Sequence, residues 1–152
     1  MKSVKIIFYI FLVVLIGFYR ETFFVRIAWY EHASIDESFA PSSFPLLGFL
    51  DHLSFEQLNY MRYIGTVLFS VLFWLLALLL NKWFFQIQSN SKITHFFFAL
   101  LFLAGVIVFV LYKLFPKAEL LYELSRWMMQ FIQSPLCILF LLPVFLLRKN
   151  AI

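Results

Sequence analysis

The stretch YIGTVLFSVLFWLLALLLN (Tyr63–Asn81) contains no charged residue and lies between Arg62 and Lys82. A helix needs about 20 mostly apolar residues to cross the hydrocarbon core of a bilayer. Two later stretches, Ile93–Tyr112 and Trp127–Leu147, have the same character and are also bounded by basic residues. Each of the three stretches therefore predicts a membrane-spanning helix.

The composition of the whole chain is typical of a membrane protein. Of its 152 residues, 64% are hydrophobic and 13% are charged, whereas soluble globular domains average about 25% charged residues. The net charge is +4, but the basic residues are scattered. We therefore expect membrane lipids as partners and no nucleic acid. A single cysteine cannot form an internal disulfide.

The apolar segment at the amino terminus is shorter than the other three. Ile6–Tyr19 has 14 residues before Arg20, which is also the length of the apolar region of a signal peptide. No small-residue cleavage site follows it, so we interpret the segment as an uncleaved first helix. Thr22–Tyr30 either extends this helix onto the bundle or lies along the headgroups.

The four segments predict one all-α, polytopic membrane domain over residues 1–152. Its helices are expected to span about 5–25, 60–81, 93–113 and 120–147, with one long outer loop over about 26–59. Ser54 and Gln57 have the spacing of a capping box, which predicts a helix start there. Four crossings place both termini on one side. Lysine and arginine are densest on that side, which favours cytoplasmic termini.

Polar side chains recur on one face of the fourth predicted span. Arg126, Gln130 and Gln133 are three or four residues apart, and Glu119 and Glu123 continue this spacing outward. Residues at such spacing share one side of a helix. We therefore predict an inward-facing polar stripe in the outer half of this span.

The second predicted span carries a weaker series, Arg62, Thr66 and Ser70, also in its outer half. An unsatisfied polar group in hydrocarbon costs several kcal/mol, so both series should face protein or water. One alternative is a set of hydrogen bonds that join helices. The other is a polar recess, open to the outer face, for a lipid headgroup, a peptide carboxylate or an acidic residue of a partner. The two series together are the candidate contact site.

The last span also contains two prolines and the only cysteine. Pro135 and Pro143 each remove a backbone donor, which predicts bends that either fit the bundle or act as a gating hinge. Cys137 has no histidine in its span and is interpreted as a packing residue. No nucleophile–base pair, metal-ligand spacing or phosphate-binding loop occurs, so we expect neither an enzyme nor a cofactor.

The ending LSRWMMQFIQSPLCILFLLPVF resembles the C-terminal part of small exosortase-associated membrane proteins of Bacteroidetes, of the exosortase F system-associated type or a sister family. The shared features are an arginine near the outer end of the last helix, a Gln-x-Pro-Leu step and a later Leu-Pro pair. In this chain they are Arg126, Gln133, Pro135, Leu136, Leu142 and Pro143. Arg62 with Tyr63 resembles the start of the family's second span, and Arg20–Phe24 resembles its segment after the first helix.

This resemblance covers about half of the chain and implies a partner rather than a reaction. The implied partner is a larger integral membrane protein, an exosortase-like transpeptidase that processes sorting signals on exported proteins. The favoured hypothesis is therefore a non-catalytic accessory or assembly subunit in a bacterial inner membrane, belonging to a protein-sorting system. The alternative is a protein that binds or transports a lipid or small anion through a polar recess at the outer leaflet.

Overall fold

The computed structural model describes the whole chain except residues 1, 34–49, 51, 87, 116 and 151–152. Apart from short turns, the elements of this described part are helical. They are α1 (Lys2–Ala33), α2 (Phe55–Leu80), a π-helical turn η2 (Asn81–Phe85), α3 (Gln88–Leu114), α4 (Glu119–Ile132) and α5 (Pro135–Asn150).

The prediction of an all-helical membrane protein is confirmed at this level. Val4–Tyr30, Phe55–Phe85 and Asn90–Leu114 are each long and apolar enough to cross a membrane. The fourth predicted span is not one straight helix, because α4 and α5 meet at an angle of 63°. The described residues thus contain three candidate spans, or four if this bent pair is one broken span.

The structure corrects the boundary between the first helix and the predicted outer loop. The loop was placed over about 26–59, with extension of the first helix through Thr22–Tyr30 left open as an alternative, and α1 continues to Ala33. Ile27 and Tyr30 are buried in a small cluster with Leu50 and Leu58, so Thr22–Tyr30 extends the helix. The last turns of α1 therefore pack against the start of α2. The predicted loop residues 34–49 lie outside the described part.

The start of α2 agrees with its sequence signal. The Ser54 side chain accepts a hydrogen bond from the Gln57 backbone amide, and the Gln57 side chain accepts one from the Ser54 amide. This reciprocal pair satisfies two of the backbone donors that a helix leaves unpaired at its first turn. The predicted capping box is confirmed, and α2 begins at Phe55.

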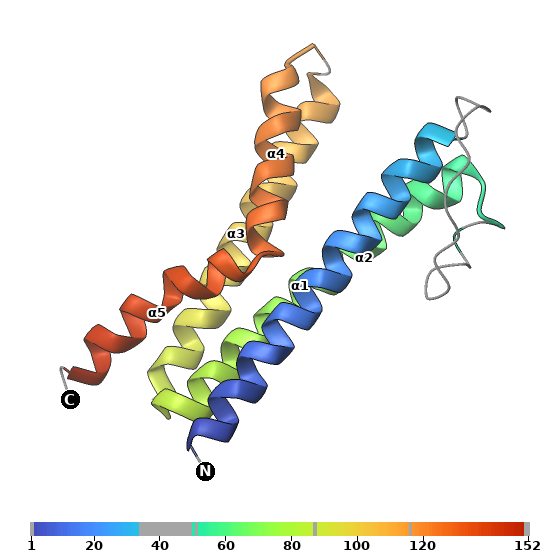
Figure 1. Ribbon diagram of the computed structural model, residues 1–152. Coiled ribbons are helices and arrows are strands. Elements are labelled where there is room, and N and C mark those ends of the chain that lie inside the picture. Colours follow the sequence, from blue (N-terminus) through green and yellow to red (C-terminus); the bar gives the residue numbers. More distant parts are fainter. Residues whose placement is uncertain (1, 34–49, 51, 87, 116, 151–152) are drawn as a thin grey trace.

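The helices form two antiparallel pairs (Figure 1): α1 lies along α2, and α3 lies along α4. We call the end where α1 ends, α2 begins and α3 turns into α4 the loop end. The opposite end, which we call the terminal end, carries the start of α1, η2 and the end of α5. The two pairs diverge towards the loop end (Figure 1).

The main core lies where α5 crosses towards α2 and α3. Phe73, Ile132 and Phe145 are fully buried there, and Tyr9 donates a hydrogen bond to the carbonyl of Leu76 at 3.2 Å. This core joins the pairs in the half of the bundle nearer the terminal end, and a ring contact between Tyr63 and Phe109 joins α2 to α3 nearer the loop end. Their loop-end halves are left with large exposed surfaces.

Candidate functional site

One face of α4 packs against α3 through small residues. The Ser125 hydroxyl, which is buried, donates to the carbonyl of Gly105 at 3.3 Å. A Cβ at Gly105 would lie 2.8 Å from the terminal methyl of Met129. Such small side chains allow two membrane helices to approach closely. Ser125 is thus the polar residue through which α4 contacts α3.

The predicted polar residues of α4 lie on a different face. Glu119, Glu123, Arg126 and Gln130 are all exposed, and we call these four residues the α4 polar stripe. The prediction that Arg126 and Gln130 face inward is wrong. The physical reason is that α4 packs another side, with Ser125 at the contact, against α3 and leaves its polar side outside.

The stripe is regular in geometry. With about 100° per residue, its four members fall within an arc of roughly 60° and extend along about 16 Å of helix. Leu120, Leu124 and Trp127 form a neighbouring exposed sector that is apolar. The ion pair recorded among the described residues joins Arg20 to Glu21. No ion pair to the described part of the chain neutralises the three stripe charges.

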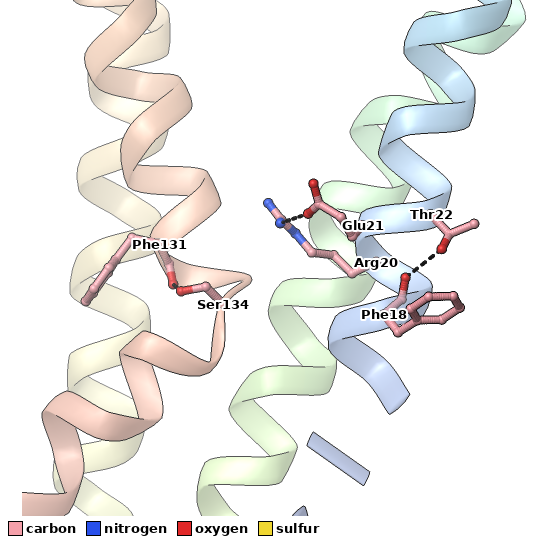
Figure 2. A network of polar contacts seen from close by, with 6 residues as sticks. All are labelled: Phe18, Arg20, Glu21, Thr22, Phe131 and Ser134. Atoms are coloured by element: carbon pink, nitrogen blue, oxygen red, sulfur yellow. Dashed lines mark hydrogen bonds and ion pairs between the residues drawn. The ribbon is translucent and has the colours of Figure 1, made fainter. Parts of the chain in front are cut away.

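Gln133 follows the stripe along the chain and is the one residue of the predicted series that is buried, with 2% of its surface exposed. It caps the carboxyl end of α4. Below it, the backbone amide and the hydroxyl of Ser134 both donate to the carbonyl of Phe131, at 3.1 and 2.8 Å (Figure 2). Pro135 opens α5 directly afterwards. Pro135 has no backbone N–H with which to bond this carbonyl. Ser134 supplies the donors instead.

The two hydroxyls of the series on α2 donate within their own helix. The Thr66 hydroxyl donates to the carbonyl of Arg62 at 2.9 Å, and the Ser70 hydroxyl donates to the carbonyl of Thr66 at 2.7 Å. These bonds to the preceding turn leave neither hydroxyl donor for another helix. Because α2 and α4 diverge towards the loop end (Figure 1), the structure does not bring Arg62 and the α4 polar stripe into one recess.

Arg20 and Glu21 form a polar pair that is not part of the predicted contact site. Arg20 Nη1 donates to Glu21 Oε2 at 2.8 Å, and the guanidinium lies 5.5 Å from the centre of the Phe24 ring. Figure 2 shows both side chains on the side of α1 that faces the α4–α5 break. The Arg20 side chain is 17% exposed, so Arg20 faces protein rather than extending freely to the interface. A charged pair within an apolar segment was the available signal.

The break itself contacts α1 one turn before Arg20. A Cβ at Gly17 would lie 4.0 Å from the ring of Pro135. Cys137, next to the break, is fully buried, and its thiol donates to the carbonyl of Ser134 at 3.0 Å. This is the packing environment predicted for Cys137. Among the residues that the structure describes, no three His, Cys, Asp or Glu side chains gather in one place.

Two surface pockets on the described part of the chain are candidate ligand sites, and both are mainly apolar. One lies along α2 from Tyr63 to Leu72. The other lies between Ile16 and the α2 residues Leu72–Lys82. Neither contains Arg62, Arg126 or a residue of the α4 polar stripe. The predicted polar recess therefore has no counterpart in these two pockets.

No protein-family model, curated protein or solved structure matches the chain. The fold and composition define a class, that of all-helical proteins with several candidate membrane-spanning helices. The resemblance to exosortase-associated proteins stays a prediction.

Proposed function

We propose that this protein is a non-catalytic accessory or assembly subunit of a bacterial inner-membrane complex, and that the α4 polar stripe is its docking surface. The stripe carries the proposal because it presents two carboxylates, a guanidinium and an amide in one line. Such a line of charges can select a partner by its charge pattern. Electrostatic complementarity contributes to partner choice and orientation more than to affinity.

The surroundings of the stripe support a helical partner in the same membrane. Leu120, Leu124 and Trp127 flank the stripe with exposed apolar surface. A partner helix with basic residues opposite Glu119 and Glu123, and an acidic residue opposite Arg126, would cover both sectors. Each exposed ion pair would contribute roughly 0.2–1 kcal/mol, so the charges would set the register while the apolar contacts supply most of the affinity.

The resemblance of the chain ending to exosortase-associated proteins suggests which partner to test first. That partner is an exosortase-like transpeptidase, a larger integral membrane protein. In the proposed orientation both termini are cytoplasmic, because Lys82 and Lys92 flank a short connection without acidic residues. The α4 polar stripe then lies towards the outer face. A transpeptidase that processes sorting signals on exported proteins would meet the stripe on that side.

The alternative function, binding or transport of a lipid or small anion between Arg62 and Arg126, has less support. These two arginines are on helices that diverge. Thr66 and Ser70 direct their hydroxyls into their own helix. We therefore place the docking surface on α4 alone.

Photocrosslinking in native membranes tests the proposal. A photoreactive residue at Gln130 is expected to yield one discrete adduct with a larger membrane protein, whereas the same residue at the exposed Leu103 of α3 is expected to yield none.

Reversing the stripe charges (Glu119→Lys, Glu123→Lys and Arg126→Glu together) should abolish the adduct. Reversing Glu56, an exposed carboxylate at the start of α2, is the matched control and should leave it intact. Equal adducts from Gln130 and Leu103, or an adduct that survives reversal of the stripe, would refute the docking surface.

A further inference from the structure

A shallow apolar groove of about 540 Å³ runs along the middle of α2. It is lined by Tyr63, Ile64, Val67, Leu68, Val71 and Leu72. These residues repeat at the spacing of one helix side, and nine helical steps from the first to the last cover about 13–14 Å. The hydrocarbon core of a bilayer is about 30 Å thick. The groove is therefore as long as one leaflet of hydrocarbon.

The aromatic end of this groove is linked to a cation, Lys113, through one intervening ring. The ring of Tyr63 meets the ring of Phe109 on α3, with centroids 6.1 Å apart. The Lys113 ammonium lies 5.6 Å from the centre of the Phe109 ring and 5.9 Å from that of Tyr112. At such distances a ring face attracts a cation. Lys113 is exposed and has no ion pair within the described part of the chain.

We propose that the α2 groove and Lys113 form a binding site for one anionic phospholipid. An acyl chain would lie along Ile64–Leu72, and the phosphate would accept from the Lys113 ammonium. Tyr63 lies between the two, as expected of an aromatic ring at the boundary between headgroup and hydrocarbon. A partner helix crossing the bilayer would need a surface about twice as long. The groove therefore fits a lipid better than a protein segment.

This site is separate from the α4 polar stripe and does not depend on the proposed function. It also differs from the recess predicted between Arg62 and Arg126, because its cation is Lys113 and its wall is apolar. The chain offers a matched control for that cation. Lys117 is a second exposed lysine, four residues further on in the α3–α4 turn, and nothing places it beside the groove.

Native mass spectrometry of the full chain in mild detergent tests the site. The chain is mixed with equal amounts of phosphatidylglycerol and phosphatidylcholine that carry the same acyl chains. We expect one phosphatidylglycerol to be retained preferentially per chain. Lys113→Gln should reduce this preference about fivefold, as expected for a contribution of about 1 kcal/mol from one lysine near a lipid surface. Lys117→Gln should leave the preference unchanged.

A second pair of variants tests the groove. Val67→Trp fills it and should reduce retention of both lipids, whereas Leu103→Trp, on an exposed part of α3 outside the groove lining, should not. Circular dichroism checks that each variant keeps its helices. Equal retention of the two lipids by the unmodified chain, or equal effects of the two lysine variants, would show non-specific lipid only and overturn the proposal. Crosslinking from Gln130 reports on the docking surface independently.

Discussion

Gly65 of α2 lies directly against the ring of Phe23 of α1, so closely that a single added methyl group would overlap the ring. Phe23 also meets the ring of Phe69 one turn further along α2, with centroids 5.8 Å apart. This contact fixes the distance between α1 and α2 in their loop-end halves, where the core at the terminal end does not reach. The absence of a side chain at Gly65 is therefore a packing requirement.

Gly65→Ala should destabilise the protein by about 1–3 kcal/mol, because an overpacked contact forces rings or helices to shift. Gly105→Ala is the matched control. Its added methyl group would meet the end of the Met129 side chain, which is flexible and can move aside. We expect a clearly lower apparent melting temperature in detergent for Gly65→Ala than for Gly105→Ala, and partial recovery when Phe23→Leu is added. Equal effects at both glycines would contradict this account.

Substituting Ser125 should destabilise the protein more than substituting Gln130. The sequence pattern predicts the reverse order. Ser125→Leu removes the hydrogen bond to Gly105, worth about 0.6 kcal/mol on average in membrane proteins, and pushes α4 away from α3. Gln130→Leu changes an exposed side chain and should alter stability by less than about 0.5 kcal/mol. Thermal unfolding of the two variants in detergent decides the matter. If Gln130→Leu is the more harmful, the polar stripe faces inward after all.

Arg20 should contribute more to the stability of the protein than its ion pair with Glu21 does. Glu21 is 66% exposed, so Glu21→Ala should cost less than about 1 kcal/mol. Arg20→Ala also removes the contact with Phe24 and empties space opposite the α4–α5 break, so a larger loss is expected. Comparing the melting temperatures of both single variants and of the double variant separates the two effects. Identical losses would mean that the ion pair accounts for the whole effect of Arg20.

The bend between α4 and α5 should depend on Ser134 and Pro135. A straight helix from Leu120 to Leu147 would span about 40 Å, whereas two equal halves bent by 63° span about 34 Å. Spin labels at these two exposed positions, measured by pulsed electron resonance, should report the shorter distance. The double substitution Ser134→Ala and Pro135→Ala should shift the distribution towards the longer one. An unchanged distance would mean that tertiary packing, rather than Ser134 and Pro135, causes the bend.

Orientation in the membrane is tested by single cysteines in a Cys137→Ala background. The exposed Gln86 and Lys117 lie near opposite ends of the bundle. With both termini cytoplasmic, an impermeant thiol reagent should label Lys117→Cys in intact cells (with the outer membrane permeabilised, where one is present). Gln86→Cys should be labelled only after lysis. The reverse pattern would place the α4 polar stripe on the cytoplasmic side.

The sequence predicts where the helices lie along the chain, but not which side of each helix packs against protein. The reason is physical. Uncharged runs such as Tyr63–Asn81 mark a helix wherever it lies, because a backbone in hydrocarbon must bond internally. Such runs do not show which side meets protein, because lipid and protein interior are equally apolar. The regular spacing of Arg126 and Gln130 correctly predicts that they share a face, but not which way the face points.

Small residues indicate better which sides of the helices pack together. Ser125 lies in a series of bulky side chains on α4, and Gly105 is the one glycine of α3. Together they mark the contact between the two helices. The bend at Pro135 was predictable from the proline. Its stabilisation by Ser134, and the contact of Pro135 with α1 at Gly17, depend on how distant segments meet, which no local pattern encodes.

The pairing of neighbouring helices has a consequence for how the chain reaches its fold. The two most extensive helix contacts join α1 to α2 and α3 to α4, segments that follow one another in synthesis. Each hairpin can close before the next part of the chain has been made, at little loop-closure cost. Phe145, near the end of the chain, then completes the core around Phe73. α5 thus adds the last part of the core, and a chain cut short before α5 would join its two hairpins through the contacts of α2 with α3 and α4, without the buried Phe145.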